Sequence, residues 1–218
     1  MKKLLFWMVL IVGIVVLLGS CAKKDDATAA TTTTTFTSTT TASGSITVGS
    51  VAMSGTYVSG CNTSGVAAAV SGGYFPSDAV ANRDVIVVTG NDNVSEESYF
   101  YTDTTCSTLS VYLLDGNDNF TVGDQSGDYY KVGYNETGFK IKAGTTVAEA
   151  YYENHFSTNN ITNEGTAVNL VVGTEYSMSG SGSLKKNLWS VTSTTIETGE
   201  EDRSTQPTAM DSMVMTKE

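Results

Sequence analysis

The chain has 218 residues, of which 23 are acidic and 12 basic, giving a formal net charge of −11. This acidic balance repels nucleic-acid phosphates and anionic lipid surfaces, so the sequence excludes a nucleic-acid function. Charged residues make up only 16% of the chain, whereas Thr, Ser, Gly, Asn, Val and Tyr are plentiful. Such a composition is typical of strands and tight turns and predicts an all-β protein.

The first segment has the pattern of a secretory signal peptide. Lys2 and Lys3 precede an apolar run over residues 4–18, and small residues follow it. As a helix these residues reach about 22 Å, which is short of a hydrocarbon core roughly 30 Å thick. The length therefore favours a cleaved signal over residues 1–20, with an uncleaved membrane anchor as the alternative.

The end of this segment, Leu18-Gly19-Ser20-Cys21, resembles the lipobox of bacterial lipoproteins. The resemblance implies that Cys21 carries a diacylglyceryl group and a further acyl chain, and that it begins the mature chain. Two or more lipid chains attach a protein stably to a membrane. Ala22 after the cysteine is similar to the signal for outer-membrane sorting. The resemblance implies a bacterial envelope location and leaves open whether the domain faces the periplasm or the cell surface.

The mature chain divides into a tether and one domain. Residues 21–44 are rich in Thr, Ser and Ala and show no apolar periodicity, so they predict a disordered tether behind the lipid. Residues 45–218 are long enough for a single domain with a sizeable core. Because the two signal lysines are lost, the mature chain keeps 10 basic and 23 acidic residues, a formal charge of −13.

The domain alternates strand-like runs with turn-forming clusters. About nine to eleven short strands are expected. They cover residues 46–48, 55–58, 83–89, 95–102, 108–114, 129–134, 139–142, 167–172, 175–179, 188–198 and 208–216. Turns are expected at 90–93, 115–119 and 124–127, and the sequence Asn-Glu-Thr-Gly at 135–138 predicts a hairpin turn. Within 95–102, Tyr99 and Tyr101 are expected on one face and Phe100 on the other.

One short helix is predicted over residues 146–156. Thr146 and Glu149 fit a capping box, and Ala148, Tyr152 and His155 have helical spacing. A further turn of helix is possible over residues 66–70. The remaining elements form an antiparallel meander.

The order of elements resembles a lipocalin-like (calycin) barrel. The resemblance rests on Gly55-Thr56-Tyr57 in the first strand, the meander after it, and a late helix with closing strands. It implies a sheet that is closed or nearly closed into a barrel, which removes exposed strand edges. Lipocalins usually carry Trp where Tyr57 stands, and a β-sandwich is the alternative architecture.

Two cysteines remain once Cys21 is lipidated. Exported chains meet an oxidising compartment, so Cys61 and Cys106 are expected to form a disulfide. Two thiols and one histidine do not supply a four-ligand zinc site, and no metal or other cofactor is expected.

Three patterns of residue types that are common in catalytic or metal sites have simpler explanations. Asp115, Asn117 and Asn119 match the opening of a calcium-binding loop, but the required glycine and glutamate are missing, which favours a solvated turn. His155, the only histidine, has Glu149 and Glu153 nearby but no nucleophile motif, which favours a structural role. The acidic pairs at 96–97 and 200–201 are interpreted as solvated charges in or near turns. The protein is therefore not expected to be an enzyme.

The aromatic residues of the strands lead to two functional hypotheses. The first is a binding module for a small apolar ligand or an envelope component, held in a cup lined by aromatic side chains. The candidate ligand-binding residues are Tyr57, Tyr99, Tyr101, Tyr112 and Trp189. The alternative is a structural or surface-interaction lipoprotein that contacts another protein and holds no internal ligand.

Overall fold

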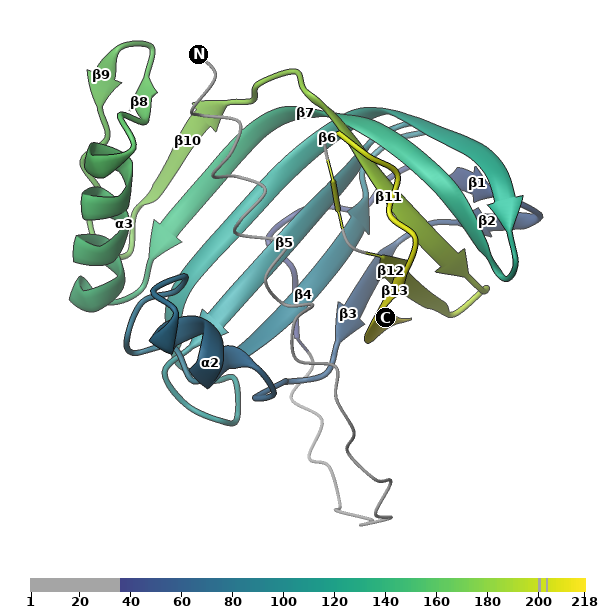
Figure 1. Cartoon of the computed structure of the whole chain (residues 1–218). Helices are drawn as coiled ribbons and strands as arrows, with labels where there is room; N and C mark the ends of the chain where they lie inside the picture. Colours follow the sequence, from purple (N-terminus) through teal and green to yellow (C-terminus); the bar gives the residue numbers. More distant parts are fainter. Residues whose placement is uncertain (1–35, 200, 203) are drawn as a thin grey trace.

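In the computed structural model, which describes residues 36–199, 201–202 and 204–218, one antiparallel sheet closes on itself. The closed barrel has eight strands (Figure 1). In order around the barrel they are β7 (Tyr129–Ala143), β11 (Leu184–Val191), β12 (Thr195–Gly199), β13 (Met210–Lys217), β3 (Thr56–Ser59), β4 (Ala81–Val88), β5 (Val94–Tyr101) and β6 (Leu109–Ser126). Since β6 pairs in turn with β7, the ring is complete. The barrel agrees with the calycin-like architecture, and the β-sandwich alternative is wrong.

One strand lies outside the ring. β10 (Glu175–Ser179) pairs with residues 138–142 of β7, while β11 pairs with residues 130–135 on the same edge. β10 and β11 therefore lie end to end along the same edge of β7. Two short hairpins complete the strands: β1 (Ile46–Val48) with β2 (Val51–Met53), and β8 (Thr162–Asn163) with β9 (Thr166–Ala167).

The predicted turns inside β6 and β7 are wrong. Residues 115–119 and 135–138 lie within these strands, which run past them without a break. Their turn-forming residues are accommodated by β-bulges: the register shifts between Gly116 and Asn117 and again after Asp118, and Asn119 has φ +53°. The hairpin between the strands turns at Gly127 and the residue after it, at the end of the turn predicted over residues 124–127, and Gly127 has φ +64°.

Other predicted boundaries also shift. The expected strand 188–198 is two strands, because Thr192 and Thr195 close a turn between β11 and β12. The strand expected over 167–172 shrinks to β9, and β2 was not predicted. The closing strand is confirmed, since β13 pairs with both β12 and β3. The predicted helix is α3 (Thr146–Thr158), and its N-cap is Thr145 rather than Thr146.

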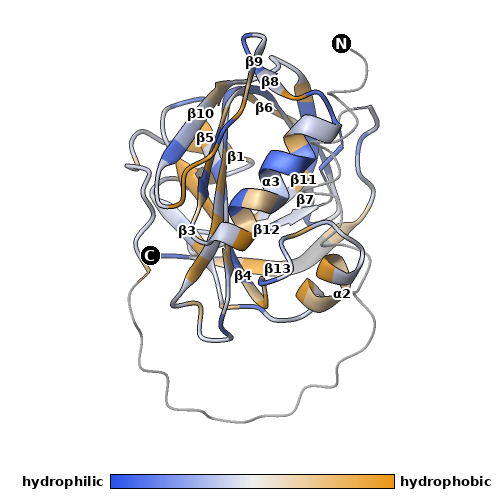
Figure 2. Ribbon diagram, turned by 90° about the vertical axis from the view of Figure 1, so that its left-hand side faces the viewer, coloured by the Kyte–Doolittle hydropathy of each residue, from blue (hydrophilic) through white to orange (hydrophobic). Residues whose placement is uncertain are grey.

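Each end of the barrel is covered. At one end α3 and α2 (Val66–Ser71) pack their buried side chains against the inner face of β5, β6 and β7. Figure 2, which looks toward this end, shows α3 crossing the opening with α2 beside it. At the other end Ile46, Val48 and Met53 of the β1–β2 hairpin join the apolar cluster inside the barrel. Both hydrophobic clusters are therefore closed off from solvent.

Candidate functional site

A layer of polar side chains crosses the interior between the two apolar clusters. Along the inner face of β5, Phe100 belongs to the cluster beneath the helices, Glu96 follows, and Val94 belongs to the cluster beneath the hairpin. β6 repeats the order, with Leu113 in the first cluster and Asp115 after it. We call this layer the polar belt. Its members are Glu96, Asp115, Asn117, Tyr134, Lys185, Asn187 and Glu201.

Lys185 is the centre of the belt. Its side chain is fully buried, with 0% exposed, and its Nζ lies 2.9 Å from Asp115 Oδ2. The same nitrogen lies 3.3 Å from Glu201 Oε2 and 3.7 Å from Glu96 Oε2. Strands β5, β6 and β11 and the segment before β13 therefore meet at one ammonium group. A buried ion needs such partners because its desolvation costs several kcal/mol.

Neutral donors complete the belt. The Tyr134 hydroxyl donates to Glu96 Oε1 at 2.7 Å and lies 3.3 Å from Glu201 Oε2. Asn117 Nδ2 donates to Glu96 Oε2 at 3.1 Å, and Asn187 Nδ2 donates to the Tyr134 hydroxyl at 3.3 Å. These bonds link β5, β6, β7 and β11 across the interior, so the belt fixes the register of strands that are distant in sequence.

Burial changes the protonation of the belt. Desolvation raises the pKa of Glu201 to about 8, against the opposing effect of the Lys185 ammonium. Lys185 is also desolvated, but the carboxylates of Asp115, Glu201 and Glu96 outweigh this and raise its pKa above the ordinary value. At neutral pH the belt thus holds a protonated Glu201 and a charged Lys185.

The interpretation of residues 96–97 and 200–201 as solvated charges is wrong for the three of them that the structure describes. Glu96 and Glu201 belong to the belt, and Glu97 is 2% exposed on the other face of β5. Asp115 and Asn117 likewise lie within a strand rather than a solvated turn. Two acceptors of the belt, Asp115 Oδ1 and Asn117 Oδ1, have no donor among the described residues.

The candidate ligand-binding aromatics are not brought together in one cup. Tyr57 and Trp189 lie inside the barrel in the cluster beneath the β1–β2 hairpin, and each is 0% exposed. A side chain with no accessible surface does not line a void even the size of a water molecule. Phe120 packs against Trp189 with ring centroids 4.8 Å apart. These inner aromatic side chains fill the barrel.

Tyr99, Tyr101 and Tyr112 lie on the outside of the barrel wall. Register places Glu97, Leu114 and Lys140 side by side across β5, β6 and β7, and Lys140 is exposed in an ion pair with Glu175. The face that carries Glu97, and therefore Tyr99 and Tyr101, points outward. Its buried apolar side chains form what we call the outer-wall patch. The patch consists of Val58, Ala81, Val85, Val87, Tyr99, Tyr101, Tyr112 and Leu114.

An extended segment, Phe36 to Ser43, lies over this patch, and we call it the strap. Phe36 packs edge-on against Tyr99, with ring centroids 4.9 Å apart. Ser38 Oγ donates to the Glu97 carboxylate, lying 2.9 and 3.0 Å from its two oxygens. Thr39 Oγ1 donates to the Tyr112 hydroxyl at 3.0 Å. Part of the stretch predicted as a disordered tether, from Phe36 onward among the described residues, therefore packs on the barrel, and for this part the prediction is wrong.

The strap and the patch hold one buried carboxylate. Tyr99 donates to Glu97 Oε2 at 2.5 Å, in addition to the donation from Ser38 of the strap. Burial is the main cause that raises the pKa of Tyr99, and the bond to Glu97 adds to it. Burial also raises the pKa of Tyr112 to about 12. Both hydroxyls stay protonated at neutral pH and act as hydrogen-bond donors or acceptors.

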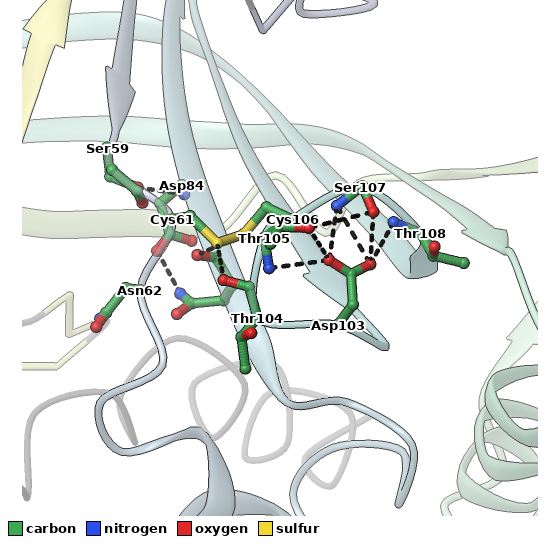
Figure 3. The surroundings of a disulfide bond; sticks show 12 residues. Ser59, Cys61, Asn62, Asp84, Asp103, Thr104, Thr105, Cys106, Ser107 and Thr108 are labelled. Atoms are coloured by element: carbon green, nitrogen blue, oxygen red, sulfur yellow. Dashed lines mark hydrogen bonds between the residues drawn. A yellow bond between two sulfur atoms is a disulfide. The ribbon is translucent and has the colours of Figure 1, made fainter. Parts of the chain in front are cut away.

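The predicted disulfide is confirmed. Cys61 and Cys106 are bonded with their Cα atoms 5.8 Å apart (Figure 3). The bond joins the end of β3 to the loop between β5 and β6, where Asp103 accepts hydrogen bonds from Thr105, Ser107 and Thr108. Both cysteines pack beside the outer-wall patch. The disulfide therefore pins the wall on which the strap lies.

His155 lies on α3 among aromatic rings, and burial lowers its pKa. Glu153, considered as its partner, accepts instead from the Leu170 backbone N–H at 2.9 Å.

Within the described part of the chain no three His, Cys, Asp or Glu side chains are grouped so as to hold a metal ion. A cavity of about 20 Å³, lined in part by Val66, Phe75 and Phe100, has room for a single water molecule.

Sequence reasoning missed both the polar belt and the outer-wall patch. The alternation of faces in residues 95–102 was predicted correctly, with Tyr99 and Tyr101 opposite Phe100. The sequence does not show how the strands pair, and only their register places Glu96 beside Asp115 and Glu97 beside Leu114. A single strand read alone does not reveal which acidic residues are buried.

No helix among the described residues is long and apolar enough to cross a membrane. The predicted signal peptide, Cys21 and most of the tether lie outside the residues that the structure describes. No protein-family model matches the chain. No curated protein matches it either.

Proposed function

We propose that this protein is a bacterial envelope lipoprotein, held at the membrane by lipid on Cys21, whose barrel is a non-catalytic module that contacts another envelope protein through its outer wall. The anchor rests on the lipobox-like sequence at residues 18–21, and the Thr-rich stretch that follows gives the barrel reach.

The outer-wall patch is the observation that carries the proposal. An antiparallel barrel normally presents polar side chains on its outside and apolar ones inside. Here β3 to β6 carry apolar or aromatic side chains on both faces, and among the described residues the strap packs over Tyr99 and Tyr112 on the outside. The side chains of the patch are at most 8% exposed while the strap is in place, so release of the strap would uncover apolar surface of the kind that is typical of interaction sites.

The other hypothesis, a small apolar ligand inside the barrel, has less support. Tyr57 and Trp189, the inner members of the candidate set, have no accessible surface. The layer between the two inner clusters is ionic, with Lys185 at its centre, and it is a poor environment for an apolar molecule.

Native mass spectrometry of the mature chain, extracted in mild detergent from its own envelope, tests the proposal. We expect a bound protein that is lost when the outer wall is altered by Glu97→Arg but kept when Lys140→Glu changes a nearby exposed site. Repeated recovery of the chain with an increment of a few hundred daltons and no bound protein would support the internal-ligand hypothesis instead. A Cys21→Ser chain that still sediments with membranes after a salt wash would refute the lipid anchor.

A further inference from the structure

The strap binds the outer wall in the manner of a peptide ligand. Its residues alternate in exposure: Phe36, Ser38, Thr40 and Ala42 are half-buried, whereas the residues between them are exposed. This two-residue period is that of an extended chain with one face on a surface. Its C-terminal end is fixed by the Ser43 backbone N–H, which donates to the Val88 carbonyl at 2.9 Å.

The contacts of the strap define a pattern of recognition. An aromatic ring at position 36 fits between Tyr99 and Arg83, whose guanidinium carbon lies 4.9 Å from the ring centroid. Two residues later a hydroxyl donates to Glu97. The wall thus selects an aromatic side chain and a hydroxyl donor at a spacing of two, and it holds them by side chains from strands that are already rigid.

The chemistry of the wall restricts what else can occupy it. Glu97 is 2% exposed, so an acidic side chain at the position of Ser38 would place two carboxyl groups against each other and remove the hydroxyl donor. Arg83 favours an aromatic ring, since a cation over a ring face is stabilised. The surrounding patch is apolar or aromatic, which favours a partner segment with few charges.

We infer that the outer wall is a peptide-recognition site for an extended, uncharged segment of a partner protein containing Phe-x-Ser or a close equivalent, and that the strap occupies this site in cis. The inference rests on the proposed function and supplies the chemistry of its partner. Because the strap is covalently attached, its effective concentration at the wall is in the millimolar range, and a partner must compete with it.

A labelled peptide with the sequence of residues 34–43 tests the inference by fluorescence anisotropy against the mature chain. In a chain carrying Phe36→Ala and Ser38→Ala the strap is weakened, and we expect the peptide to bind at least tenfold more tightly than to wild type. The matched control peptide, in which the phenylalanine is alanine, should bind the same variant at least tenfold more weakly. Equal binding of the two peptides, or of the native peptide to both chains, would overturn the inference.

A second variant keeps the result decisive. If the double variant fails to fold, as judged by circular dichroism, Ser38→Asp releases the strap through repulsion from Glu97 and should admit the peptide equally well. Failure of the Ser38→Asp chain to bind the native peptide also overturns the inference. If the peptide fails to bind, the further inference is refuted but the proposed contact with an envelope protein is not. If the peptide binds but no envelope partner is found, only the proposed function is refuted.

Discussion

Lys185 Nζ lies 2.9 Å from Asp115 Oδ2, although 70 residues separate them in sequence. The contact crosses the inside of the barrel from β11 to β6, two strands that both pair with β7. It explains why ionic groups are placed in a core that is otherwise apolar. Lys185 has its charged partners in this strand register alone. Any other register would leave its ammonium group buried without a partner, and the cost of that burial disfavours the alternatives.

Removing the central cation should destabilise the barrel strongly. Lys185→Met leaves the buried carboxyl groups of Glu96, Asp115 and Glu201 close together without a counter-charge, and we expect a loss of about 3–5 kcal/mol in the free energy of unfolding. Lys140→Met is the matched control. It breaks only the exposed ion pair with Glu175 and should cost no more than about 1 kcal/mol. Urea unfolding of both variants decides, and equal losses would contradict the central role of Lys185.

The belt also predicts how stability depends on pH. Because the pKa of Glu201 is raised to about 8 in the folded state from an ordinary value near 4.5, the folded chain keeps a proton that the unfolded chain loses. This contribution is therefore complete below pH 4.5 and declines as the pH rises to 8, by up to about 5 kcal/mol. Glu201→Gln, which keeps a neutral amide in place of the protonated acid, should flatten the curve over this range. A wild-type curve that rises between pH 5 and 8 while the variant's stays parallel to it would contradict the assignment.

The disulfide should contribute about 4 kcal/mol. Cys61 and Cys106 are 45 residues apart, and closing a loop of this length limits the unfolded chain by about that amount. A chain with both cysteines replaced by serine should unfold at correspondingly lower urea concentration. Dithiothreitol should lower the urea midpoint of the wild-type chain toward that of the double variant and leave the double variant's midpoint unchanged. If the reductant also lowers the midpoint of the double variant, its effect does not come from the Cys61–Cys106 bond.

The two adjacent threonines at the start of α3, Thr145 and Thr146, should differ in their contribution to stability. Thr145 Oγ1 accepts from the Ala148 N–H at 3.1 Å and donates to Asp78 Oδ2 at 2.7 Å. Thr145→Ala should cost about 1–2 kcal/mol, as expected for loss of a cap. Thr146, favoured as the cap by the sequence, is exposed, and Thr146→Ala should change stability by less than about 0.5 kcal/mol. Thermal unfolding of the two variants distinguishes the caps, and the reverse ranking would contradict the structure.

Much of the architecture followed from sequence, because local patterns determine it. Turn clusters at 90–93 separate β4 from β5, helical spacing marks α3, and the cysteines pair as the compartment suggested. The pattern failed in β6 and β7, where Asp, Asn and Gly occur. These residues favour turns and bulges alike, and only pairing with a neighbouring strand selects the bulge.

The buried charges could not be predicted for a different reason. Glu96 and Glu97 are adjacent acidic residues, which in isolation are best solvated. Their burial depends on Lys185 and Tyr134 on one face and on Ser38 and Tyr99 on the other. All but Tyr99 are distant in sequence, so the signal exists only once the barrel has closed.

Site-specific photocrosslinking in the native envelope tests the role of the outer wall most directly. A benzophenone amino acid replaces Tyr101 of the outer-wall patch in a Phe36→Ala chain, and Val214, which is exposed on β13, serves as the control position. We predict a crosslinked envelope protein from position 101, more abundant than in the chain with an intact strap, and none from position 214. No crosslinked protein from position 101, or a partner captured only at position 214, would contradict the proposal that the outer wall is the binding surface. Equal crosslinking in the Phe36→Ala chain and the chain with an intact strap would contradict competition by the strap.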